Sequence, residues 1–190
     1  MTDREKQALR NFAAGYNCAQ SMFMAYADLL GLTQEQAARL SAGFGGGIGR
    51  LRQNCGAFSA AVMLCGALTP EGGKPESRPE VYRRVQAIHA AFVERCGTVN
   101  CAQLLGRHAG AEAPTPEERT PAYYASRPCA RVILQACRIV EEHLQEQAYS
   151  KKRREPGWAS GAFLWKALKE AGHTVLHDTF LFLNHIMNLK

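Results

Sequence analysis

The spacing of apolar residues along the chain predicts helices. In segment 79–95, Val85, Ile88 and Phe92 recur at three- and four-residue intervals, which is the pattern of one helix face. Comparable spacing predicts further helices over 3–14, 18–30, 33–42 and 128–147, and a short helical turn over 101–105. No stretch alternates apolar and polar residues as a half-buried strand would. We therefore expect an all-α fold without a sheet.

Segment 55–68 has a different character, because its residues are apolar or small almost throughout (CGAFSAAVMLCGAL). A helix that is apolar on every side is a buried one. Its small side chains would let neighbouring helices approach closely. These features predict a compact multi-helix bundle built around a central helix rich in small residues.

The composition of the chain changes near residue 150. Four consecutive basic residues, 151–154, are followed by apolar segments that predict two more helices. We therefore expect one helical domain over 1–149, and a basic linker with a C-terminal helical appendage over 150–190. The appendage carries His173, His177 and His185, whose spacing is better explained by scattered surface histidines than by a metal site.

Cysteines recur at predicted helix starts. The sequence Asn-Cys-Ala-Gln occurs at 17–20 and again at 100–103, Asn54 precedes Cys55, and Cys129 follows Pro128. Asparagine is a preferred N-cap residue, and proline is tolerated in the first turn. The sequence thus predicts that four helices begin at cysteines, namely Cys18, Cys55, Cys101 and Cys129.

A helix start changes the chemistry of a cysteine. The unpaired N–H groups and the positive end of the helix dipole favour the thiolate and lower the thiol pKa. Four such starts that converge would suit an anionic sulfur cluster or a metal. The other three cysteines, Cys65, Cys96 and Cys137, lie among apolar residues and are expected to fill the core.

A glycine-rich stretch, 43–50, lies just before Cys55. It has no preceding strand and no Gly-Lys-Ser/Thr sequence, so a nucleotide-binding loop is not expected. We expect a tight backbone segment that brings N–H groups near sulfur or lets helices pack closely. The residues expected to support the site in this way are Gly45, Gly46, Gly47, Gly49, Arg50 and Gly56.

Composition and charge narrow the possible functions. The 190 residues are 46% hydrophobic, which is typical of a globular protein, and carry a net charge of +6. Neither an aromatic platform nor zinc-finger spacing accompanies the basic run, so nucleic-acid binding is not expected. The charged N-terminus does not resemble a signal peptide, and no long apolar run predicts membrane insertion. We expect a cytoplasmic protein, in which seven cysteines are metal ligands, redox thiols or core residues rather than a disulfide framework.

Together these motifs resemble the C_GCAxxG_C_C family of redox-active proteins, which is known for four cysteines and a Cys-Gly-Ala-x-x-Gly motif. The resemblance runs in order from residue 1 to about 147. It rests on Asn-Cys-Ala-Gln at 17–20, the glycine-rich 43–50, Cys-Gly-Ala at 55–57, Asn-Cys at 100–101, Leu-Leu-Gly at 104–106 and Cys129. Ala60 replaces the last glycine of the motif, and residues 151–190 lie outside the family's domain.

The resemblance implies redox activity carried by the same four cysteines. Relatives include cytochromes in which this domain precedes a haem region and is thought to hold iron–sulfur. This chain has no Cys-x-x-Cys-His, so haem is not expected.

Three functions stay open. The cysteines could bind an iron–sulfur cluster or another metal ion for electron transfer or sensing. They could instead pair reversibly, Cys18 with Cys55 and Cys101 with Cys129. The chain could also be a helical binding module without redox chemistry. For the redox functions we expect an unidentified redox partner, and assembly as a homodimer stays open.

Overall fold

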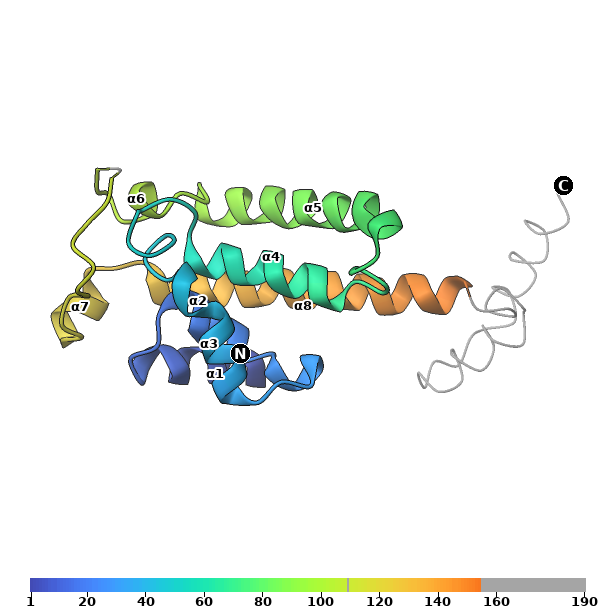
Figure 1. Ribbon diagram of the computed structural model, residues 1–190, viewed down its shortest axis with the longest axis horizontal. Helices are drawn as coiled ribbons and strands as arrows, with labels where there is room; N and C mark the ends of the chain where they lie inside the picture. The colour runs from blue at the N-terminus through green and yellow to red at the C-terminus, as the bar shows by residue number, and fades with distance from the viewer. Residues whose placement is uncertain (109, 155–190) are drawn as a thin grey trace, which may run out of the picture. The chain divides into compact units, whose positions relative to one another are not determined.

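The computed structural model describes residues 1–108 and 110–154, and the side chains of residues 146–154 are not described. Figure 1 shows the arrangement of these residues. The chain divides into two units, Met1–Leu144 and Gln145–Lys190. The expected C-terminal helices and their three histidines lie outside the described residues.

The all-α prediction is confirmed, since the regular structure of the described residues is helical, with no strand. Short 3₁₀ turns at 27–30, 42–44 and 75–77 connect α-helices. The α-helices are α1 (Asp3–Ala13), α2 (Cys18–Met24), α3 (Gln34–Ser41), α4 (Gly56–Leu68), α5 (Arg78–Cys96), α6 (Cys101–Leu104), α7 (Pro121–Ala125) and α8 (Cys129–Arg154). None of the helices in the described ranges has the length and hydropathy that crossing a bilayer requires.

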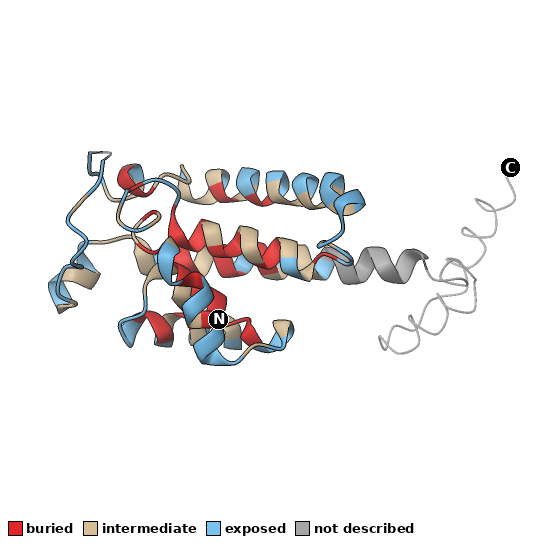
Figure 2. Ribbon diagram, viewed as in Figure 1, coloured by how far each residue is buried: buried red, intermediate tan, exposed pale blue. Residues whose placement is uncertain are grey.

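Helix α4 is the central helix that its composition predicts. It packs against α2 on one side and α5 on another, and most of its first ten residues are buried (Figure 2). Ala60, which stands where the family motif has glycine, is fully buried. The buried residues of α4 are Gly56, Ala57, Phe58, Ala60, Ala61, Leu64 and Cys65.

Helix α8 is fixed against the N-terminal helices by polar contacts. Arg138 Nε lies 2.6 Å from Oε1 of the buried Glu5 on α1. The hydroxyl of buried Tyr26 donates to the Cys137 carbonyl oxygen across 3.2 Å. Because these contacts fix the axis of α8, they also fix the position of Cys129, its first residue.

Two predicted boundaries were wrong. The helix expected over 18–30 ends at Met24 and gives way to a 3₁₀ turn over Ala27–Leu30. Helix α8 does not end near 147, but continues through the basic run to Arg154, where a linker was expected. Lysine and arginine are good helix formers and are favoured at a helix C-terminus, so this run can extend the helix.

The glycine-rich stretch opens a loop over residues 43–54, and part of this loop has backbone φ angles in the left-handed region. Five consecutive residues, 46–50, have positive φ, including the non-glycine Ile48 and Arg50. The N–H of Gly49 bonds to the Gly43 carbonyl at 2.8 Å, and the N–H of Gln53 to the Gly47 carbonyl at 3.0 Å. These N–H groups therefore bond to carbonyls of the loop itself rather than to a phosphate or a sulfur.

Replacing Gly47 with alanine should destabilise the protein more than replacing Gly49. Both have left-handed φ values, +72° and +54°, so both variants carry the cost of about 1–2 kcal/mol for an L residue in this conformation. Only at Gly47 would the added Cβ collide, 2.6 Å from Cys101 Cβ, whereas the space at Gly49 is open. We expect the free energy of unfolding, measured in urea, to fall by about 1–3 kcal/mol more in Gly47→Ala than in Gly49→Ala, which is the usual cost of overpacking. Equal losses for the two variants would contradict this close approach.

Candidate functional site

The four cysteines at predicted helix starts line a single small cavity of about 20 Å³. Cys55 and Cys101 are buried, while Cys18 and Cys129 are partly exposed. That volume is about the space of one water molecule. The other residues around the cavity are apolar or lack polar side-chain atoms: Gly56, Ala57, Leu104, Leu105, Pro128 and Val132.

Cys18 is placed by the capped start of α2. The Asn17 side chain accepts hydrogen bonds from the N–H groups of Ala19 and Gln20, each at 3.0 Å, as the motif predicts. Its amide nitrogen also donates to the Ala42 carbonyl across 3.0 Å. The same side chain therefore caps α2 and ties its start to the end of α3.

Cys55 and Cys101 are joined by main-chain hydrogen bonds. Asn54 and Asn100 form an isolated antiparallel bridge. The Cys55 N–H donates to the Val99 carbonyl across 2.7 Å, and the Cys101 N–H donates to the Gln53 carbonyl across 2.6 Å. This bridge, which the sequence did not predict, brings together two cysteines that lie far apart in the chain.

Of the three other helix starts, only the start of α4 differs from the prediction. Asn100 caps α6 through its side chain, which accepts from the Gln103 N–H at 3.0 Å. Cys55 is itself the N-cap of α4, with no side-chain cap bond, and not the first helical residue as expected. Cys129 begins α8 as expected.

Three glycines allow the helix starts to pack closely, because neighbouring atoms occupy the space where a side chain would lie. A Cβ on Gly45 would meet the Asn17 side chain at 2.4 Å, and one on Gly47 would meet Cys101 at 2.6 Å. A Cβ on Gly56 would lie 3.0 Å from the backbone nitrogen of Ala19 in α2. The glycines thus let the loop and the start of α4 pack directly on the starts of α2 and α6.

The expectation of lowered pKa values is wrong for three of the four thiols. Burial raises the pKa of Cys55 to about 12, although the N–H groups of Phe58 and Ala57 oppose this. Burial also raises the pKa of Cys101, against the opposing effect of Arg52. The free-energy cost of removing a thiolate from water is therefore larger here than the stabilisation that a helix N-terminus gives it.

Cys18 and Cys129 form an interacting thiol pair. The hydrogen bond between them raises the pKa of Cys18 and lowers the pKa of Cys129. The nearby positive charges of Arg127, Arg119 and Arg52 also lower the pKa of Cys129. Cys129 is therefore the thiol of the four that most readily becomes a thiolate.

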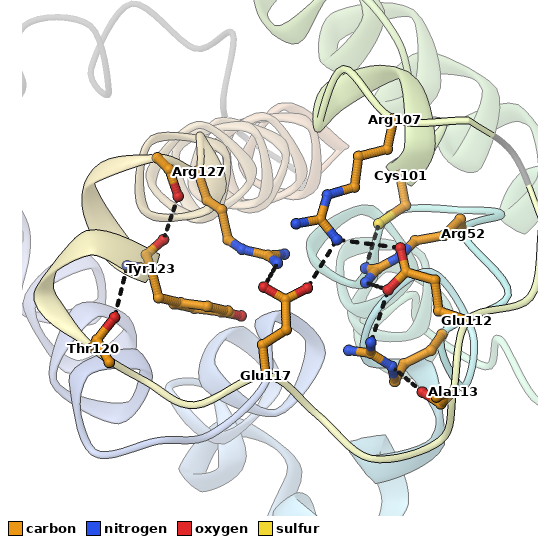
Figure 3. A network of polar contacts seen from close by, with 11 residues as sticks. Arg52, Cys101, Arg107, Glu112, Ala113, Glu117, Thr120, Tyr123 and Arg127 are labelled. Carbon is orange, nitrogen blue, oxygen red and sulfur yellow. Dashed lines mark hydrogen bonds and ion pairs between the residues drawn. The ribbon is translucent and has the colours of Figure 1, made fainter.

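Arg52 connects the cavity to an ion-pair network (Figure 3). Its Nη1 lies 3.8 Å from the Cys101 sulfur, and its guanidinium makes two hydrogen bonds to the Glu112 carboxylate, one of them Nε to Oε1 at 2.7 Å. Arg50 binds the same carboxylate at 2.8 Å and the Ala113 carbonyl at 2.5 Å. The sequence motifs pointed to Arg50 as a residue of the supporting loop, but not to Arg52 or Glu112.

The network continues to the side of Cys129. Arg107 contacts Glu112 at 3.3 Å and Glu117 at 2.8 Å, and Arg127 binds Glu117 at 2.6 Å. Arg127 also stacks on the Tyr123 ring, with 4.2 Å from its guanidinium carbon to the ring centroid. We call this set the arginine–glutamate network: Arg50, Arg52, Arg107, Arg127, Glu112 and Glu117.

The three remaining cysteines pack in or against the hydrophobic core. Cys65 and Cys137 are buried, and the partly exposed Cys96 packs against the buried cluster. None of the three lines the four-cysteine cavity. This is the core-filling position expected for them.

The arrangement bears on which metal group the thiols could hold. Among the described residues, no three histidine, cysteine, aspartate or glutamate side chains gather closely enough to hold a single metal ion. The donor chemistry of four thiols around one cavity fits an iron–sulfur cluster, which four cysteines commonly ligate through several iron atoms. Four thiols are the donor set of an iron–sulfur cluster and also of a tetrahedral zinc ion.

Comparison with known proteins gives the family. Residues 16–143 match the model of the family described as "Putative redox-active protein (C_GCAxxG_C_C)". The chain belongs to this family. A protein of Archaeoglobus fulgidus, described only as an uncharacterized protein, is 28% identical over 140 residues, which cover 69% of this chain and 86% of that protein. No solved structure matches the chain.

Protonating Glu112 should weaken the folded state at low pH. Its hydrogen bonds with Arg52 lower its pKa to about 2, from an ordinary value of 4.5. Its ion pairs therefore contribute stability above pH 4.5, and this contribution is lost as the pH falls toward 2. We expect Glu112→Gln to be less stable than the unmodified protein at pH 7, and the difference in unfolding free energy to shrink at pH 3. A difference that stays constant from pH 7 to pH 3 would contradict this role of the carboxylate.

Proposed function

We propose that Cys18, Cys55, Cys101 and Cys129 bind an iron–sulfur cluster, and that the protein acts in electron transfer or redox sensing. The observation that carries this proposal is that four thiols from four separate helix starts line one cavity. Membership in a family described as redox-active supports it.

The surroundings of the thiols suit an anionic group. Cluster ligands are thiolates, which need compensating positive charge when they are removed from water. The N–H groups at the start of α4 oppose the rise that burial causes in the pKa of Cys55, and Arg52 and Arg127 bring positive charge toward Cys101 and Cys129. A bound cluster would supply one-electron exchange, while Leu104, Leu105 and Val132 keep water from the sulfurs.

Anaerobic reconstitution with iron and sulfide tests the proposal. We expect the unmodified protein to take up both elements and to show the visible absorption of a cluster. Cys→Ser changes at each of positions 18, 55, 101 and 129 should lose most of the bound iron and sulfide, because each removes a ligand. Cys96→Ser is the matched control, since Cys96 lies outside the cavity. Failure of the unmodified protein to bind iron and sulfide, or equal loss in Cys96→Ser, would overturn the proposal.

The Cys18 and Cys129 thiols line the same cavity and shift each other's pKa values, which favours a second candidate, a reversible thiol–disulfide centre. The Cys129 thiolate would attack a disulfide oxidant and release one of its sulfurs as a thiol. The Cys18 sulfur would then displace the second, forming the Cys18–Cys129 bond. The protein loses two electrons and two protons, and the oxidant becomes two thiols.

Oxidation of the metal-free protein with glutathione disulfide tests this second candidate. We expect the number of free thiols to fall by two, and peptide mass spectrometry to find Cys18 linked to Cys129. Cys55→Ser and Cys101→Ser should still form this bond, although both should lose the cluster. A link between other cysteines, or no loss of thiols, would rule out the Cys18–Cys129 centre and would leave the cluster proposal standing.

A further inference from the structure

We propose that Arg52, held in place by Glu112, sets the reduction potential of the four-cysteine centre. The inference rests on the proposed cluster, and it deepens that proposal by naming the residues that regulate it. Arg52 acts on the centre through Cys101, and Glu112 is a positioning residue that acts through Arg52.

Arg52 has an unusual place for an arginine. Its side chain is 2% exposed, and it reaches the Cys101 sulfur from the glycine-rich loop. Its backbone is left-handed, with a φ of 59°, a conformation that costs an L residue free energy. Strained non-glycine residues that are held by their surroundings concentrate at functional sites. The chain therefore tolerates both strain and burial to point a positive charge at this sulfur.

Glu112 holds this guanidinium from the other side. Two of its hydrogen bonds come from Arg52, and its own backbone N–H donates to the Arg50 carbonyl across 3.1 Å. Segment 110–120 is therefore fastened to the glycine-rich loop by main chain as well as side chains (Figure 3). The Glu112 side chain is 27% exposed, whereas the Arg52 side chain that it binds is buried.

The network leaves a net positive charge beside the sulfurs. Its four arginines outnumber its two glutamates, so it carries two positive charges in excess. Arg52 contacts Cys101 at one end, and Arg127 at the other end lies two residues before Cys129 in the chain. The set thus spans two of the four candidate ligands.

The sign of the effect follows from charge. Reduction adds an electron to the centre, and a positive charge nearby stabilises the more negative, reduced form. Hydrogen bonds to the sulfurs and net charge are known determinants of cluster potential. Removing the positive charge of Arg52 should therefore lower the potential, and removing the negative charge of Glu112 should raise it.

Three variants of the full-length, reconstituted protein test the inference. Arg52→Gln should have a more negative midpoint potential than the unmodified protein in anaerobic redox titration. Glu112→Gln should have a more positive one, since glutamine keeps the size and one acceptor oxygen of glutamate but not its charge. Glu80→Gln is the matched control, because Glu80 also pairs with two arginines, Arg83 and Arg84, but lies outside the network.

Iron and sulfide content separates the two proposals. If the unmodified protein binds no cluster, the proposed function and this inference both fall. Suppose that all variants bind the cluster. If the midpoint potentials of Arg52→Gln and Glu112→Gln equal that of Glu80→Gln, or if both potentials shift in the same direction, only the inference is overturned. Should Arg52→Gln fail to fold, the shift of Glu112→Gln to a higher potential than Glu80→Gln decides the matter alone.

Discussion

The four-cysteine cavity depends on direct backbone packing at the glycine-rich loop. A side chain at Gly47 would collide with Cys101, and one at Gly56 with the first turn of α2. Because protein interiors are close-packed, such contacts leave little freedom in where these helix starts can lie. The bridge through Asn54 and Asn100 adds main-chain hydrogen bonds, so the relative position of Cys55 and Cys101 does not depend on side-chain rotamers. The cysteines are thus brought together by the absence of side chains as much as by contacts between them.

Burial and helix N-termini act on these thiols in opposite directions. For Cys55 and Cys101 burial prevails, and the pKa values rise. A metal-free centre therefore keeps its protons on the buried thiols and avoids gathering negative charge in a small apolar cavity. Binding of iron must displace those protons, since the ligand is the thiolate. The positive ends of the helices and the arginine–glutamate network would then compensate the negative charge of the thiolate ligands.

Local features of the sequence predicted most of the fold, but not the contacts that complete the site. Apolar spacing and the Asn17 and Asn100 caps predicted helices correctly, because both act within a few residues. The site needs pairs that are distant in sequence. Arg52 and Glu112 are 60 residues apart, and nothing in the polar segment around Glu112 distinguishes it from a solvated charge. The lowered pKa values expected for Cys55 and Cys101 were wrong for the same reason, since the degree of burial is set by the whole fold.

The two redox chemistries place different demands on the same sulfurs. A disulfide requires the sulfur atoms of Cys18 and Cys129 to lie about 2.05 Å apart, whereas a cluster requires all four cysteine sulfurs to bind iron. Cys55 and Cys101 are fixed by the bridge, while Cys18 and Cys129 are partly exposed and are not part of it. Oxidation of that pair would remove two of the four candidate ligands. A molecule with the disulfide therefore cannot hold the cluster through all four cysteines, and a bound cluster would protect the pair from oxidation.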